Sequence, residues 1–223
     1  MSTLSQRAAA ELIGTALLLA CVVGSGIMGV KLSGGNNAIA LLANAAATAG
    51  ILYMLIVCIS PISGAHFNPV VSLVMHLRGE LMPRDFFVYV LAQVLGAVLG
   101  VLLAHAMFDL PLLQTGIHAR TGAAQWLSEG VASFGLLLTI LLGVRHRPAA
   151  VPALVAGYIF AAYWFTASTS FANPAVTLAR SLTTTFAGIR PDDVGGFVLA
   201  QISGALLATV TVRLWPQDER TPG

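Results

Sequence analysis

Two asparagines, each followed by a proline, are the polar residues of this chain whose type and spacing most clearly indicate a functional site. They stand in one phrase written twice, SGAHFNPVVSL at Ser63–Leu73 and STSFANPAVTL at Ser168–Leu178. An asparagine at the start of a helix can cap it while its amide N–H points elsewhere, and a proline fits the first helical turn at no cost. The motif residues are Asn68, Pro69 and Val70 in the first copy, and Asn173, Pro174 and Ala175 in the second.

The sequence offers no catalytic chemistry around these motifs. It contains no recognisable nucleophile, metal-ligand cluster or nucleotide-binding loop. We therefore expect a protein that is not an enzyme, with no cofactor and no bound metal. Cys21 and Cys58 both lie in apolar runs, where a buried thiol is expected more than a disulfide or a metal ligand.

The composition predicts an integral membrane protein. Of the 223 residues, 57% are hydrophobic and only 9% are charged. These are too few charged residues to give every helix a polar face toward water, so a soluble globular protein is excluded. The net charge of +2 comes from few ionised groups, and no basic cluster is present that could bind nucleic acid. The expected partners are the lipid bilayer and small solutes.

Six stretches reach the length of about 20 residues that a membrane-spanning helix needs. They are Arg7–Val30, Asn36–Ser60, Asp85–Met107, Ala123–Val144, Ala149–Ala167 and Val194–Leu214. The two Asn-Pro segments follow the second and the fifth stretch. Because non-helical backbone at membrane depth must be buried in protein or line a watery cavity, both segments should fold inward. Paired interrupted segments of this kind are typical of a binding or conducting site at the midplane.

The two halves of the chain repeat one another outside the motifs as well. Glu11 in the first span matches Glu129 in the fourth, and Gln93 in the third span matches Gln201 in the sixth. Three spans per copy is an odd number, so the second copy must be inverted relative to the first. We expect one channel domain over residues 1–223, with inverted repeats of approximately 1–118 and 119–223.

The basic residues indicate the orientation. If both termini are cytoplasmic, seven arginines fall on the inner side, and three arginines and Lys31 on the outer side, in agreement with the positive-inside rule. We expect a multi-pass protein of the bacterial inner membrane. The long apolar run near the N-terminus is then the first membrane helix and is not a cleaved signal peptide.

Taken together, the paired Asn-Pro motifs, the two glutamates and the two Gln-x-x-Gly-Ala segments resemble the aquaporin (major intrinsic protein) family over essentially the whole chain. The resemblance implies an all-α membrane fold: a right-handed bundle of six transmembrane helices plus two re-entrant half-helices. It also implies one pore per subunit and a homotetramer. In the family, residues matching Glu11 and Glu129 accept hydrogen bonds from the inward loops. His66, Gln93 and Gln201 match positions that support this network.

Two alternatives to this supporting network stay open from the residues alone. The glutamates could belong to a proton relay, although no further ionisable group in the spans continues one. The chain could also be an ion-coupled, alternating-access transporter built on the same inverted repeat, with Glu11 and Glu129 as its coupling groups.

The chain departs from the family at the outer constriction. Most members place an arginine directly after the second motif, where this chain has Val176. Family spacing assigns the other constriction positions to Thr48, Ala161 and Ser170. These four residues predict a selectivity filter that has no cation, no aromatic ring and little bulk. A valine at this position resembles bacterial aquaporins of arsenic-resistance operons, which conduct arsenite and methylated arsenicals.

Arg180 is a cation close to this filter in the sequence. It lies four residues after Val176, one turn further along the same helix face. We expect it to end the helix and to extend its side chain to the membrane interface. The alternative is that it restores a positive group at the outer mouth of the pore.

The sequence thus predicts a passive channel for small neutral solutes. The expected solutes are arsenite, other metalloid hydroxides or methylated arsenicals, water and glycerol-like polyols. If the two half-helices meet at the centre, their N-terminal dipoles would repel a cation about 5 Å away by about 3 kcal/mol.

Overall fold

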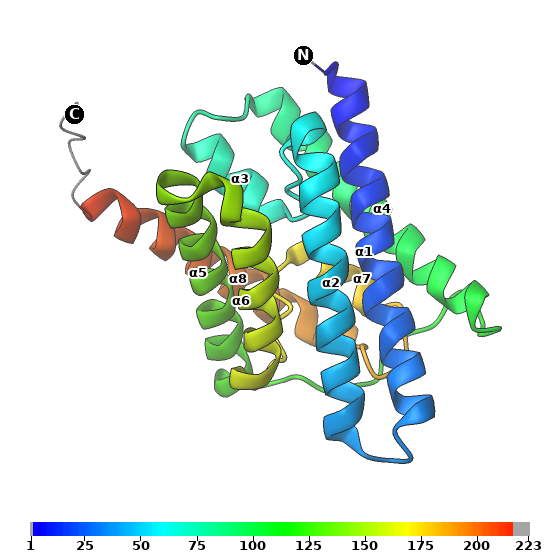
Figure 1. Cartoon of the computed structure of the whole chain (residues 1–223). Helices are drawn as coiled ribbons and strands as arrows, with labels where there is room; N and C mark the ends of the chain where they lie inside the picture. Colours follow the sequence, from blue (N-terminus) through cyan, green and yellow to red (C-terminus); the bar gives the residue numbers. More distant parts are fainter. Residues whose placement is uncertain (1, 216–223) are drawn as a thin grey trace.

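The computed structural model describes residues 2–215 as an all-helical bundle, without strands in that range (Figure 1). The long helices are α1 Leu4–Leu32, α2 Asn37–Ser63, α4 Pro83–Met107, α5 Ala123–His146, α6 Val151–Phe165 and α8 Pro191–Leu214. The short helices are α3 Pro69–Leu77 and α7 Pro174–Arg180, and a 3₁₀ turn at Pro148–Ala150 leads into α6. This confirms the predicted fold class of six spans and two half-helices.

The six long helices, with the 3₁₀ turn counted as part of the fifth, have the length and apolar composition of membrane spans. Their ends differ from the predicted ends by a few residues. α2 continues through Pro61 to Ser63 and ends where Gly64 takes a positive φ of 89°. α8 begins at Pro191 instead of Val194, because proline is favourable in a first turn.

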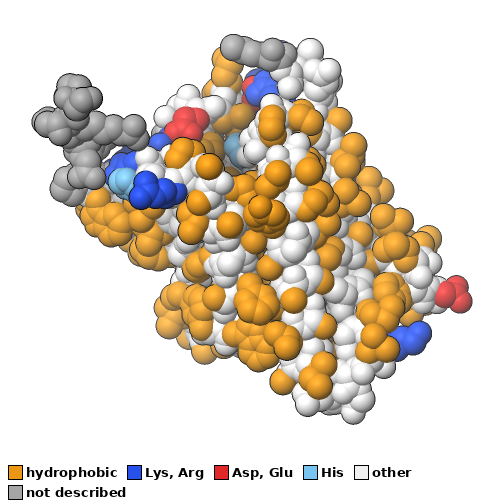
Figure 2. Space-filling model, viewed as in Figure 1, with side chains coloured by type: hydrophobic (Ala, Val, Ile, Leu, Met, Phe, Trp, Pro, Cys, Tyr) orange, Lys and Arg blue, Asp and Glu red, His pale blue; other side chains and the backbone are white. Residues whose placement is uncertain are grey.

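The surface agrees with burial in a membrane. Figure 2 shows apolar side chains over most of the visible face, with the charged groups gathered toward its two ends. We call the end where α1, α4 and α6 finish, at Leu32, Met107 and Phe165, the distal end. The end where α1 begins, at Leu4, is the proximal end.

The two halves of the chain contain the same succession of elements. Two long helices, a short helix and a further long helix make up α1–α4, and α5–α8 repeat this order. α1 packs on α4 as α5 packs on α8. The short helices run to opposite ends, so that α3 lies in the upper half of Figure 1 and α7 in the lower half. An inverted repeat requires this order and these opposite directions; the repeat boundaries near residues 118 and 119 stay a prediction.

Glycines allow the helix pairs within each half to approach closely. The Cα of Gly204 in α8 faces the carbonyl oxygen of Gly130 in α5, and Gly100 in α4 faces the carbonyl oxygen of Ala16 in α1. A Cβ at either glycine would collide with that backbone. In a membrane the hydrophobic effect does not drive helices together, because lipid is as apolar as the side chains. Small residues at the crossings instead allow close van der Waals packing.

We expect Gly204→Ala to lower the thermal stability of the detergent-solubilised protein, because the new methyl group pushes α8 away from α5. The cost should be about 1–3 kcal/mol. Gly157→Ala is the matched control, since a Cβ there meets open space. The measurement is the temperature at which the monodisperse size-exclusion peak is lost. Equal temperatures for the two variants would contradict this packing.

Candidate functional site

The two Asn-Pro motifs meet at the centre of the bundle. Each asparagine caps its own half-helix: the side-chain oxygen of Asn68 accepts from the Val70 N–H at 3.0 Å, and that of Asn173 from the Ala175 N–H at 3.0 Å. Each amide also donates to the other loop. Asn68 Nδ2 lies 2.8 Å from the Ala172 carbonyl oxygen, and Asn173 Nδ2 lies 2.8 Å from the Phe67 carbonyl oxygen.

The loop before α3 is held by Glu11 of α1. Oε2 of Glu11 accepts from the Phe67 N–H at 2.6 Å and from Gln93 Nε2 at 2.8 Å. Oε1 accepts from Ser63 Oγ at 2.6 Å and from the His66 N–H at 3.0 Å. The carboxylate is completely buried, and these four donors compensate for its lost hydration.

Glu129 of α5 repeats this arrangement for the loop before α7. It accepts from the Phe171 N–H at 2.8 Å, from the Ala172 N–H at 2.9 Å and from Gln201 Nε2 at 2.5 Å. Gln201 also donates to Thr177 Oγ1 at 2.8 Å. The repeat is therefore visible in the hydrogen bonds as well as in the order of the helices.

His66 joins the first network through its main chain, and its ring has a different partner. Its Nδ1 lies 3.0 Å from Ser72 Oγ, which also accepts from Gln93 Nε2 at 2.9 Å. The structure thus brings the five supporting residues into two clusters: Glu11, His66 and Gln93 in one, and Glu129 and Gln201 in the other.

Both loops contain strained backbone just before the asparagine. Phe67 and Ala172 each have a φ of 48°, in the left-handed region that non-glycine residues rarely enter. Such conformations persist when the surrounding contacts over-determine them. The carboxylate of the nearby glutamate and the amide of the opposite asparagine supply those contacts.

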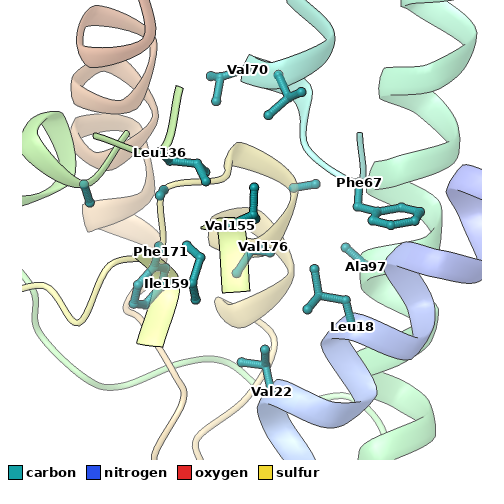
Figure 3. Packing of buried hydrophobic residues seen from close by; sticks show 14 of the residues in the cluster. Leu18, Val22, Phe67, Val70, Ala97, Leu136, Val155, Ile159, Phe171 and Val176 are labelled. Carbon is teal, nitrogen blue, oxygen red and sulfur yellow. The ribbon is translucent and has the colours of Figure 1, made fainter. Parts of the chain in front are cut away.

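A cavity of about 280 Å³ passes along the two motifs. Its lining extends from Glu80, in the loop between α3 and α4 at the proximal end, to Arg180 at the distal end of α7. Much of the wall is apolar: in Figure 3, Leu18 and Ile159 lie on either side of Val176. The polar lining residues are Thr48, His66, Asn68, Glu80, Tyr163, Ser170, Asn173 and Arg180.

Three of the four expected filter residues line this cavity, namely Thr48, Ser170 and Val176. Ala161 does not, and its assignment from family spacing is wrong in this structure. It is exposed on the outer face of α6, whereas Ile159 and Tyr163 line the cavity. Residues two apart on a helix differ by about 200° in direction, so the face that includes 159 and 163 excludes 161.

Tyr163 is a cavity residue that the sequence reasoning missed. Its hydroxyl lies 3.2 Å from Thr48 Oγ1, and its side chain is buried. The signal that could have found it is the spacing of four residues from Val151 through Val155 and Ile159 to Tyr163, which marks one face of α6. The cavity wall beside Thr48 therefore contains an aromatic ring, which the expected set of filter residues lacks.

The expectation that Arg180 extends to the membrane interface is also wrong. Arg180 is only 2% exposed and lines the cavity. Its Nε donates to the Ala187 carbonyl oxygen, and its Cζ lies 3.4 Å from the centroid of the Phe171 ring. The loop 181–190 covers this end of α7, so the guanidinium turns inward. The geometry favours the alternative of a cation at the pore mouth.

Comparison with known proteins agrees with this geometry. Residues 1–167 match the family described as major intrinsic protein. The chain belongs to this family. It is 58% identical over 217 residues to the aquaglyceroporin AqpS of Rhizobium meliloti (strain 1021), a match that covers 97% of this chain and 93% of that protein.

More distant members of the major intrinsic protein family match as well. A probable aquaporin PIP2-8 of Oryza sativa subsp. japonica is 37% identical over 142 residues, covering 63% of this chain and 49% of the plant protein. The fold is similar to the X-ray structure of the aquaglyceroporin from Plasmodium falciparum. The TM-score is 0.76 at 18% identity, covering 95% of this chain and 96% of the other. As a member of this family, the chain is a membrane channel and not an enzyme.

The supporting carboxylates lead to a prediction for Glu129→Gln. The substituted amide has one acceptor oxygen for three donors, so buried N–H groups lose their partner at a cost of about 2 kcal/mol. We expect a lower melting temperature of the purified protein, with Asp109→Asn, an exposed acid at the distal end, as the control. Unchanged stability of Glu129→Gln would show that the loop before α7 does not depend on this carboxylate.

Proposed function

We propose that the chain is a passive channel for small neutral hydroxylated solutes. Water, glycerol-sized polyols, arsenite and other metalloid hydroxides or methylated arsenicals are its substrates. The observation that carries this proposal is the cavity of about 280 Å³, in which Val176 occupies the position of the usual family arginine. Because no guanidinium projects from position 176, this part of the cavity keeps space for solutes larger than water.

The polar groups of the cavity suit a hydroxylated solute. Thr48 and Tyr163 present a pair of hydroxyls, and Ser170 Oγ is buried with no hydrogen-bond partner among the described residues. A buried hydroxyl without a protein partner favours a hydrogen bond from water or from a solute. The apolar side chains opposite these groups accept the carbon or methyl surface of the solute.

The name of the relative AqpS, an aquaglyceroporin, supports glycerol-sized solutes. The absence of arginine at 176 supports a filter that is wider than a water-only filter. Tyr163 adds bulk to the cavity wall and Arg180 adds charge, neither of which belongs to the expected filter. Arg180 lies one helical turn beyond Val176, so its guanidinium does not replace the missing arginine at position 176.

The rival function, ion-coupled alternating access, finds less support. It requires an ionisable coupling group in contact with the solute. Glu11 and Glu129 are the acids deep within the spans; both are completely buried, hydrogen-bonded to the loops and absent from the cavity lining. The same separation from the cavity disfavours a proton relay through them.

We further propose a homotetramer in the bacterial inner membrane, with both termini cytoplasmic and the distal end outside. The apolar side chains on the outside of the bundle support contact with lipid and with neighbouring subunits.

The function is tested by stopped-flow light scattering on proteoliposomes, with arsenite uptake measured on the same vesicles. We expect water, glycerol and arsenite fluxes well above those of empty liposomes, linear in solute concentration and unaffected by an ionophore. Saturable uptake that an ionophore abolishes would support the transporter instead. A wild type that conducts water alone would contradict the wide filter.

Val176→Arg should narrow the channel, so that it conducts water in preference to larger solutes. The guanidinium fills the distal part of the cavity, so glycerol and arsenite fluxes should fall at least about tenfold, which corresponds to about 1.4 kcal/mol, while water flux falls less. Val176→Ala is the control, because it leaves the cavity open. If glycerol and water fluxes fall in the same proportion, Val176 does not set the width.

Tyr163→Phe should weaken the preference of the channel for polyols over water. The change removes one hydroxyl from the cavity and leaves the ring in place, at a cost of about 1 kcal/mol for a hydroxylated solute. We expect the ratio of glycerol to water flux to fall about fivefold. Tyr158→Phe is the matched control, since that hydroxyl lies outside the cavity lining and bonds to the Ala132 carbonyl oxygen at 3.0 Å. An unchanged ratio in Tyr163→Phe would exclude this hydroxyl from solute selection.

A further inference from the structure

Phe171, in the loop before α7, has two guanidinium groups beside its ring. The Cζ of Arg180 lies 3.4 Å from the ring centroid, and the Cζ of Arg120 lies 4.8 Å from it. Phe171 is buried, lines the cavity and makes an edge-on contact with Phe197, at 5.2 Å between centroids. A ring face attracts cations, so it offsets part of the repulsion between the two arginines.

Arg120 comes from the loop 108–122 between α4 and α5, which crosses the lower part of Figure 1. Its Nη1 donates to the Ser168 carbonyl oxygen at 3.0 Å, and its Nε donates to the Gly188 carbonyl oxygen at 3.1 Å. Ser168 precedes α7 and Gly188 follows it. One half-buried side chain therefore ties together the segments on both sides of the second half-helix.

The charge of Arg120 is not cancelled by an ion pair among the described residues. The hydrogen-bond acceptors of its guanidinium are main-chain carbonyls. Asp193, the nearby acid, accepts from the Arg120 main-chain N–H and from Thr121 Oγ1, and its ion-pair partner is Arg190. Burial lowers the pKa of Arg120, but the ordinary value is so far above neutrality that the side chain stays protonated.

These contacts concern the exclusion of cations from the proposed channel. A cavity with room for polyols admits a partly hydrated cation more easily than a narrow one does, and Val176 provides no charge to exclude it. The two guanidiniums gathered on Phe171 place positive charge one helical turn further toward the distal end.

We propose that Arg120 is a specificity-determining positioning residue. It fixes Phe171 against Arg180 and supplies a second positive charge at the distal mouth, so that cations are excluded there while neutral solutes enter. This inference rests on the proposed function of a neutral-solute channel. Arg120 does not itself line the cavity, so its charge acts from a distance. For a cation that passes about 8 Å from a unit charge, an effective dielectric of about 20 to 40 lowers the occupancy of the cation roughly 5- to 30-fold.

The test uses the full chain in liposomes, with sodium leak followed by a sodium-sensitive dye and glycerol flux measured on the same vesicles. We expect Arg120→Gln to keep glycerol flux within about twofold of wild type and to raise sodium permeability roughly 5- to 30-fold. Arg120→Lys, which keeps the charge but loses the planar fork, should exclude sodium nearly as well as wild type. Lys31→Gln removes an exposed cation from the same end and should change neither quantity.

The outcomes separate the inference from the proposed function. A wild type without glycerol flux overturns the proposed function. A wild type with glycerol flux, together with an Arg120→Gln variant that excludes sodium as well as wild type does, overturns only the inference. Equal sodium leaks in Arg120→Gln and Arg120→Lys would show that Arg120 acts through loop structure and not through charge. If Arg120→Gln does not fold, Arg120→Met, which keeps an unbranched side chain without its charge, takes its place in the comparison with Arg120→Lys.

Discussion

Each re-entrant loop brings non-helical backbone to the middle of a membrane, where it is stable only if its N–H groups find partners inside the protein. Glu11 and Glu129 meet this constraint. Each carboxylate accepts two main-chain N–H groups of one loop and the side-chain amide of a glutamine on α4 or α8. The position of both half-helices, and hence of the cavity, depends on these two buried charges.

The crossed asparagine bonds connect the two halves of the bundle. Asn68 donates to the loop of the second half and Asn173 to the loop of the first, so neither loop can shift without breaking a contact of the other. The strained backbone at Phe67 and Ala172 directs these two carbonyl groups toward the opposite asparagines. The strain is thus part of what aligns the two motifs.

Much of the fold could be predicted from the sequence, because the signals for it are local and occur twice. The six spans follow from apolar length, and the two half-helices follow from Asn-Pro after a small-residue loop. A buried carboxylate needs hydrogen-bond donors, and the resemblance to the family implied that the inward loops supply them to Glu11 and Glu129.

The filter residues were harder to predict, because a loop separates α6 from the second Asn-Pro motif and the face that α6 turns toward the cavity cannot be counted through that loop. Counting back from Asn173 led to Ala161, whereas the cavity face of α6 follows Ile159 and Tyr163. The direction of Arg180 depends on loop 181–190, which covers the end of α7. The role of Arg120 depends on loop 108–122, which has no periodic pattern that would place it. Contacts made by loops far apart in sequence leave no local signal.

The residues that line the cavity wall and the arginines that pack on Phe171 lie in different parts of the protein. The apolar wall and the hydroxyls of Thr48 and Tyr163 line the cavity, while Arg180, which packs on the Phe171 ring, lies one turn further along α7. A family member with arginine at the filter combines narrowing and charge in one side chain. Here the guanidinium of Arg180 lies one helical turn away from Val176, so in the proposed channel the bulk at the filter and the positive charge come from different residues. Electrostatic repulsion acts over several ångströms at low effective dielectric, and so it does not require the guanidinium to occupy the path of the solute.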